Sequence, residues 1–266
     1  MMVFLAYMVL GAVAGVLAGL FGIGGGLIIV PALIFAFELQ GVAPEIQPHL
    51  AVGTSLATIV FTAISSIRSH HAHGSVRWDL VRFLAIGLVL GAALGAQTAA
   101  QMSGALLKLV IGLFACAMAV KMWLDIRPKP GRSVPGPLGL VVAGGGIGWA
   151  SAIFGIGGGS MMVPYLSWCN VRMQEAVGTS AACGLPIAVG GALANMVTGQ
   201  GDPLLPEYSV GYVYLPALAG VVLTSMWTAR WGVALAHRWS QQKLKRAFAV
   251  LLVIVGIRFV WKSLGV

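Results

Sequence analysis

The string FGIGGG at residues 21–26 returns unchanged at residues 154–159. Each copy is followed by an apolar stretch that reaches a proline, Pro31 in the first case and Pro164 in the second. The two copies are 133 residues apart (154 − 21). An internal repeat of this kind within a strongly apolar chain is typical of membrane proteins built from two related halves.

A second string, AVGTS, follows each copy, at residues 51–55 and again at residues 176–180. Because both strings recur in the same order, we predict two duplicated halves, a first membrane repeat over residues 1–124 and a second over residues 137–266. Residues 125–136 between them carry three prolines, which cannot continue a helix. We interpret this segment as a solvated cytoplasmic linker.

The composition is that of an integral membrane protein. Apolar residues make up 59% of the chain and charged residues only 9%, against about 25% in ordinary soluble domains. A transmembrane helix needs about 20 apolar residues. We therefore predict an all-α membrane fold with about eight to ten transmembrane segments, including Gly-rich broken or half-helices. The apolar windows lie at residues 3–20, 26–38, 50–66, 80–99, 104–124, 136–153, 157–169, 177–198, 210–229 and 245–264.

The charged residues indicate how the chain is oriented. Lys and Arg outnumber Asp and Glu by 16 to 7, but they are scattered among apolar segments, which argues against a nucleic-acid partner. They gather in the loops after the third, fifth, seventh and ninth windows, which the positive-inside rule places in the cytoplasm. With five windows in each half, the second half enters the membrane from the opposite side, so we predict two inverted-topology repeats. Both chain ends then lie on the outer side, although Arg258 and Lys262 run against this orientation.

The repeated strings predict a binding site for an anion. Glycine-rich backbone at membrane depth leaves amide and carbonyl groups free, and these must be buried in protein or line a wet cavity. A helix that begins after the glycines points its amides and its positive dipole end into that cavity. We predict that both copies converge on one midplane site, formed by Gly24, Gly25, Gly26, Thr54, Ser55, Gly157, Gly158, Gly159, Thr179 and Ser180. The alternative is that the glycines only allow close helix packing.

Three further polar residues lie in or beside apolar windows. Arg68, at the predicted cytoplasmic end of the third window, is either a contact for the anion at the inner mouth or a positive-inside anchor. Asn195, inside the eighth window, is either a substrate contact or a partner in an interhelical hydrogen bond. Lys108, one turn into the fifth window, is expected to reach the lipid headgroups with its long side chain.

No cofactor or metal is expected. The chain has no GxxxxGK[ST] string for nucleotide phosphates, and Cys116, Cys169 and Cys183 show no CxxC spacing. The HHxH string at residues 70–73 has no acidic or thiol ligand nearby and is interpreted as part of a solvated loop. Because no nucleophile and base stand at a spacing that predicts catalysis, we do not expect an enzyme.

The two strings, present in both halves, resemble those of the TauE/SafE sulfite exporter family. The resemblance covers essentially the whole chain and includes RSH at residues 68–70, GSVRW at residues 74–78 and GYVYLP at residues 211–216. It implies a multi-pass carrier in the bacterial inner membrane that exports or takes up sulfite, sulfonates, or related sulfur-containing or carboxylate anions. The substrate within this class stays open.

The residues and the resemblance together predict a secondary transporter of small organic or sulfur-containing anions, such as sulfite or sulfoacetate, that works by alternating access. The expected partners are the small anion and membrane lipid, and assembly as a homodimer stays open. An anion channel and an intramembrane enzyme or assembly factor are the alternatives. Replacing Thr54 or Thr179 by valine is expected to weaken anion binding without unfolding the protein.

Overall fold

The computed structural model of the chain describes residues 2–21, 26–125, 131–236 and 241–263. Within these ranges the fold consists of ten helices and one two-stranded hairpin, which confirms the predicted all-α membrane fold. The elements are α1 (Met2–Phe21), α2 (Gly26–Leu39), α3 (Gln47–Ala72), α4 (Trp78–Ala100), α5 (Gly104–Trp123), α6 (Pro137–Ile153), α7 (Gly159–Trp168), α8 (Met173–Thr198), β1 (Ser209–Val210), β2 (Val213–Tyr214), α9 (Leu215–Ala236) and α10 (Gln241–Ser263).

The helices differ in whether they are long enough to cross a membrane. Among the described residues, α3, α4, α5 and α8 are long and apolar enough to do so. Helices α2 and α7 have only 14 and 10 residues, or about 21 and 15 Å at 1.5 Å per residue, against a hydrocarbon core of about 30 Å. Both therefore have the length expected of half-helices, and each contains its proline, Pro31 or Pro164.

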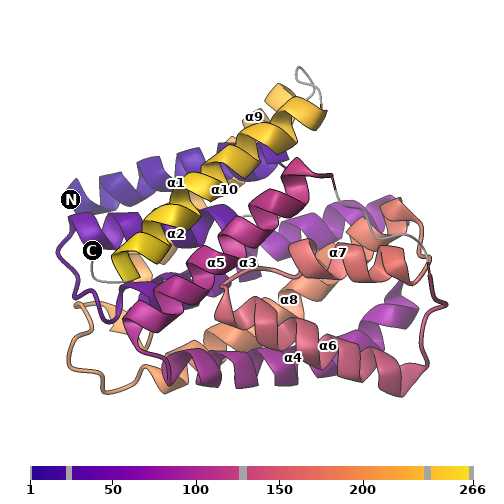
Figure 1. Cartoon of the computed structure of the whole chain (residues 1–266), viewed down its shortest axis with the longest axis horizontal. Coiled ribbons are helices and arrows are strands. Elements are labelled where there is room, and N and C mark those ends of the chain that lie inside the picture. The colour runs from indigo at the N-terminus through magenta and orange to yellow at the C-terminus, as the bar shows by residue number, and fades with distance from the viewer. Residues whose placement is uncertain (1, 22–25, 126–130, 237–240, 264–266) are drawn as a thin grey trace.

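Helices α3 and α8 form the centre of the molecule (Figure 1) and are the most buried of the four long apolar helices. They run antiparallel. Gly53 of α3 lies against Asn195 of α8, whereas Leu56, further along α3, lies against Gly191, which comes earlier in α8. The glycines allow the two backbones to approach closely, as small residues do at membrane helix contacts.

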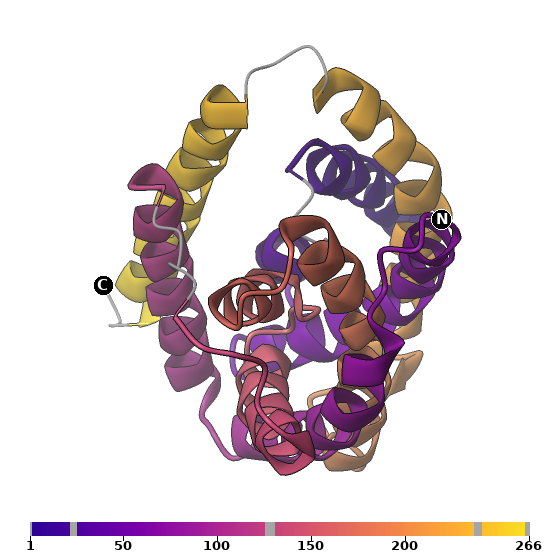
Figure 2. The same cartoon turned by 90° about the vertical axis from the view of Figure 1, so that its right-hand side faces the viewer.

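The other long contacts pair a helix of one half with a helix of the other. Helix α1 packs along α9, α4 packs along α6, and α5 packs along α10. Figure 2 shows the α5–α10 pair and the α1–α9 pair on opposite sides of the molecule. Glycine is again used at these contacts, since Gly87 and Gly91 of α4 lie directly against the backbone of Val141 and Gly145 in α6. Pairs between helices of different halves are expected if the two halves interlock. The inverted topology of the halves stays a prediction.

Three local expectations differ from the structure. Residues 210–214, expected to begin the ninth helix, instead belong to a hairpin in which Ser209 pairs with Tyr214. Their sequence, VGYVY, carries β-branched and aromatic residues that favour strands. His70 and His71 lie in the last turn of α3 and not in a loop. Lys108 is buried, with 7% of its surface exposed, and does not reach outward to the headgroups.

Candidate functional site

The two glycine strings meet in space. Gly26, the first residue of α2, lies so close to the second copy that a Cβ atom added to it would stand 2.7 Å from both the Gly155 carbonyl oxygen and the Ile156 Cα. Only glycine fits at such a contact. Gly155 has a positive φ of 65°, which other residues rarely adopt. Gly24 and Gly25, predicted to contact substrate, lie outside the described residues.

The second glycine string leads into α7. Gly157 and Gly158 precede the helix, and the amide of Met162 donates to the Gly158 carbonyl at 2.6 Å to close the first turn. A Cβ atom at Gly158 would lie 3.0 Å from Ile187 Cδ1 and 4.0 Å from the Ser180 carbonyl oxygen. The N-terminal end of α7, with its positive dipole, therefore faces α8 beside the second AVGTS string.

Among the described residues, five buried serine hydroxyls of the second half have no hydrogen-bond partner, and three of them, Ser151, Ser160 and Ser180, lie in the helices next to the second glycine string. Ser151 lies in the last turn of α6, just before the glycine string. Ser160 follows Gly159 in α7, and Ser180 belongs to the second AVGTS string. Their exposed fractions are 0%, 6% and 2%. An unpaired buried hydroxyl costs about 1–3 kcal/mol, so three of them in one part of a protein suggest groups kept for a ligand.

Sequence reasoning missed two of these serines, although a signal was present. At the offset of 133 residues that relates the glycine strings, Ser151 and Ser160 correspond to Ala18 and Leu27 in the first half. The hydroxyls therefore belong to the second copy alone. A position-by-position comparison of the two copies would have found them, whereas a search for shared letters selects only what the halves have in common.

The first AVGTS string holds the hairpin that precedes α9. Thr54 Oγ1 accepts a hydrogen bond of 3.0 Å from the Tyr214 amide, and Gly53 lies against the Tyr212 carbonyl. We call this contact the first junction: Gly53 and Thr54 with Tyr212 and Tyr214. Next to it, Ser55 Oγ donates to the Gly155 carbonyl at 2.8 Å. The serine of the first AVGTS string is therefore hydrogen-bonded to the second glycine string.

The second AVGTS string holds the segment that precedes α4. Thr179 Oγ1 accepts a hydrogen bond of 3.0 Å from the Arg77 amide, and Gly178 lies against Ser75. We call this contact the second junction: Gly178 and Thr179 with Ser75 and Arg77. A bidentate hydrogen bond to Asp79, at 2.9 and 2.6 Å, raises the pKa of the Arg77 guanidinium above its ordinary value.

The two Thr-Ser pairs do not lie together. Gly53 contacts Asn195, and Asn195 lies 15 residues (195 − 180) beyond Ser180 along α8. At 1.5 Å per residue this separates the pairs by about 20 Å along the helix axis. Gly26 thus lies against the second glycine string, but the Thr-Ser pairs stand near opposite ends of the α3–α8 contact, and a shared site stays a prediction.

The remaining two predicted site residues also differ in their surroundings. Arg68 is exposed near the end of α3. Asn195 is 1% exposed, and its Nδ2 donates to the Gly191 carbonyl at 2.8 Å, within its own helix. The backbone carbonyl of Asn195 accepts from the Tyr212 amide at 3.0 Å. Asn195 thus helps to hold the first junction, and a substrate contact by either residue stays a prediction.

The protein is closed where the glycine strings meet. A cavity of only about 10 Å³ lies there, between α2, α5 and the residues that precede α7. Such a volume holds at most about one water molecule. The rings of Phe114 and Phe154 stack over this point with their centroids 3.8 Å apart. In this conformation the residues that the structure describes leave no room for an anion at the contact between Gly26 and the second glycine string.

The described part of the chain contains no group of three or more His, Cys, Asp or Glu side chains that could hold a metal ion. The cysteines Cys116, Cys169 and Cys183 are free thiols, and the last two are buried. These residues therefore provide no evident centre for metal chemistry.

Comparison with known proteins places the chain in a family. The family model described as Sulfite exporter TauE/SafE matches residues 7–259. A probable membrane transporter protein of Haemophilus influenzae is 38% identical over 96% of this chain and 97% of its own. Another, of Methanocaldococcus jannaschii, is 27% identical over 94% of this chain and 92% of its own. No solved structure matches the chain significantly. The chain is a multi-pass membrane transporter and belongs to the TauE/SafE sulfite exporter family.

Proposed function

We propose that this protein is a secondary transporter of small organic or sulfur-containing anions, such as sulfite or a sulfonate, and that the anion binds beside the N-terminal end of α7. The observation that carries the proposal is the set of buried, unpartnered hydroxyls of Ser151, Ser160 and Ser180. Serine hydroxyls donate well to sulfonate or carboxylate oxygens. Their present lack of partners is what a site prepared for such oxygens requires.

The chemistry around these serines suits reversible anion binding. The first amides of α7 and its dipole provide a partial positive charge. Glu175 is the acidic residue in the stretch from Ser151 to Ser180, and the Arg77 guanidinium lies 3.8 Å from its carboxylate. Donors without a full cation bind an anion less tightly than a buried Arg or Lys would, because charge-assisted hydrogen bonds are about twice as strong. A carrier must also release what it binds.

Alternating access gives the two junctions a role in transport. Each joins an AVGTS string to a segment that leads into a helix of the other half, and the junctions stand about 20 Å apart along the α3–α8 axis. Both are closed in this conformation. Opening one while the other stays closed would expose the anion site to one side of the membrane. This scheme supports a carrier over a channel, which needs both sides open together.

The test is the thermal stability of the purified protein in detergent with sulfite, sulfoacetate, taurine, sulfate, thiosulfate and simple carboxylates. A ligand that binds only the folded state raises the Tm. We expect a selective rise with one class of anion. The rise should shrink in Ser160→Ala and Ser180→Ala but persist in Ser225→Ala, a matched control. Ser225 is likewise buried and has no hydrogen-bond partner within the described ranges, but it lies in α9, where it packs against Gly15 of α1.

Two outcomes would contradict the proposal. If no anion shifts the Tm, the class of substrate is wrong. If an anion shifts the Tm equally in all three serine variants, the anion binds elsewhere. Flux into proteoliposomes then separates carrier from channel, because a carrier saturates and shows exchange between the labelled anion inside and unlabelled anion outside.

A further inference from the structure

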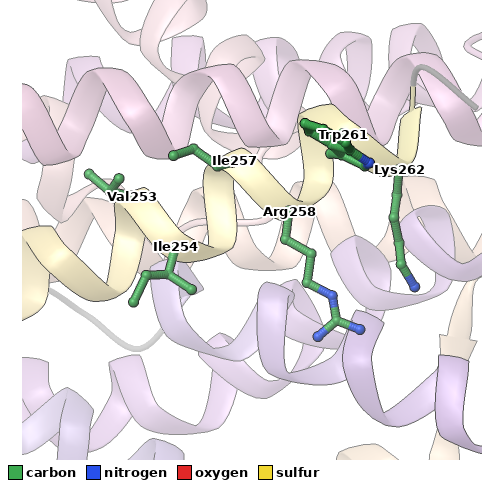
Figure 3. Close-up of a pocket in the computed structure, with 6 residues that line it drawn as sticks. All are labelled: Val253, Ile254, Ile257, Arg258, Trp261 and Lys262. Carbon is green, nitrogen blue, oxygen red and sulfur yellow. The ribbon is translucent and has the colours of Figure 1, made fainter. Parts of the chain in front are cut away.

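Helix α10 carries a groove lined by its own side chains, and the cations of this groove pair with Glu38 of α2. The groove has a volume of about 450 Å³. Figure 3 shows its side chains along α10, with Val253, Ile254 and Ile257 toward one end and Arg258, Trp261 and Lys262 toward the other. The lining residues are Val253, Ile254, Ile257, Arg258, Trp261 and Lys262. Such a surface suits a ligand with an apolar chain and an anionic head.

The cationic end of the groove carries more positive than negative charge. Arg258 Nη2 pairs with Glu38 Oε2 at 3.2 Å, and Lys262 pairs with the other oxygen of the same carboxylate. The described residues at this end therefore hold two cations against one carboxylate, a net charge of +1.

Topology does not explain these cations. The loop charges predict that the end of α10 lies on the outer side of the membrane, where Lys and Arg are disfavoured. Trp261 lies between Arg258 and Lys262 and is 60% exposed. Trp is enriched at the level of the lipid headgroups, so this end of the groove is expected to lie beside lipid phosphates.

We propose that the groove on α10 binds an anionic phospholipid, with an acyl chain along the apolar residues and the phosphate at Arg258 and Lys262. The Glu38 carboxylate would keep the two cations oriented, while the excess charge provides the preference for anionic over zwitterionic lipid. Cationic pockets beside membrane helices recognise anionic headgroups in this way. The site is separate from the anion site proposed for transport.

The test is native mass spectrometry of the full chain with phosphatidylglycerol and phosphatidylcholine added in equal amounts. We expect phosphatidylglycerol to be retained at least about fivefold better, which corresponds to about 1 kcal/mol. The double variant Arg258→Gln/Lys262→Gln should lose this preference. The charge-matched control Arg82→Gln/Arg172→Gln should keep it, because both cations are exposed and stand away from α10 along the chain, Arg82 in α4 and Arg172 directly before α8.

Further arms make the result decisive. The exchange Arg258→Lys/Lys262→Arg keeps the charge and should keep the preference, which protects the test if the Gln variant unfolds. Inorganic phosphate should not displace the lipid; if it does, the site recognises a free anion. Equal retention of the two lipids by the natural chain, or an unchanged preference in the Gln variant, overturns the proposal. A dimer of the natural chain that becomes monomeric only in the Arg258→Gln/Lys262→Gln variant would also overturn the proposal, because a second copy of the chain would then occupy the groove.

Discussion

The two AVGTS strings have the same letters but only partly the same surroundings. Thr54 and Thr179 have the same role, since the Oγ1 of each accepts a hydrogen bond of 3.0 Å from a backbone amide across its junction. The serines differ, because Ser55 is paired with the Gly155 carbonyl and Ser180 has no partner. What both copies share is therefore architecture. What distinguishes the second copy is a serine hydroxyl without a hydrogen-bond partner in the described part of the chain.

The largest effect is expected from closing the space at a junction. A Cβ atom in Gly53→Ala would overlap the Tyr212 backbone carbonyl, which cannot move without shifting the hairpin. Overpacking of this kind costs about 1–3 kcal/mol, and more where backbone must move. We expect a clear fall in Tm in detergent.

Gly184→Ala is the matched control for Gly53→Ala. Gly184 lies inside α8, but nothing stands within 4 Å of the place its Cβ would take. Alanine is favoured over glycine in a helix by about 1 kcal/mol, so this variant should be neutral or more stable. If Gly53→Ala is as stable as Gly184→Ala, the first junction is looser than the structure indicates.

Removal of a threonine hydroxyl should have the next largest effect. In Thr54→Val and Thr179→Val the Tyr214 or Arg77 amide loses its acceptor, at a cost of about 1–3 kcal/mol where the amide is buried. Thr54→Ser and Thr179→Ser keep the hydroxyl and should recover most of the loss. The sequence alone predicted weaker anion binding without unfolding, whereas the structure adds a loss of stability to each Val variant.

Anion binding by the same variants tests the two roles separately. If the threonines act only at the junctions, the anion-induced rise in Tm should survive in whichever Val variant remains folded. Loss of that rise in a well-folded Val variant would instead assign the hydroxyl to the anion site. Preserved stability in both Val variants would remove the junction role.

The sequence predicted the helices better than the contacts between them. The ten apolar windows overlap the ten helices found in the described residues, because burial in lipid imposes long apolar runs. The partners of the threonines could not be found this way, since Thr54 and Tyr214 are 160 residues apart. Lys108 was misjudged for a similar reason. Its window shows where it lies along α5 but not that Gln47 covers its ammonium.

Replacement of Ser55 and replacement of Ser180 by alanine should change the stability of the protein in opposite directions. Ser55→Ala leaves the Gly155 carbonyl without its donor and should lower stability by about 1 kcal/mol. Ser180→Ala removes a buried hydroxyl that already lacks a partner, so the protein without anion should become slightly more stable. The measurement is the Tm without and with the stabilising anion. A fall in Tm for Ser180→Ala without anion would mean that its hydroxyl has a structural partner after all.

The smallest effect is expected at the ion pair of the second junction, which the first junction lacks. Arg77 and Asp79 are bonded bidentately, but their side chains are 41% and 49% exposed, and exposed pairs contribute about 0–1 kcal/mol. We expect Asp79→Asn to lower the Tm slightly, and 1 M salt to remove most of the difference, because the Debye length falls to about 3 Å. The first junction offers the contrast, since Tyr212 there donates its hydroxyl to Asp202 at 3.1 Å, and Tyr212→Phe should be far less sensitive to salt. A loss in Asp79→Asn as large as that in Thr179→Val, unaffected by salt, would show that charge and not the threonine hydroxyl holds the second junction closed.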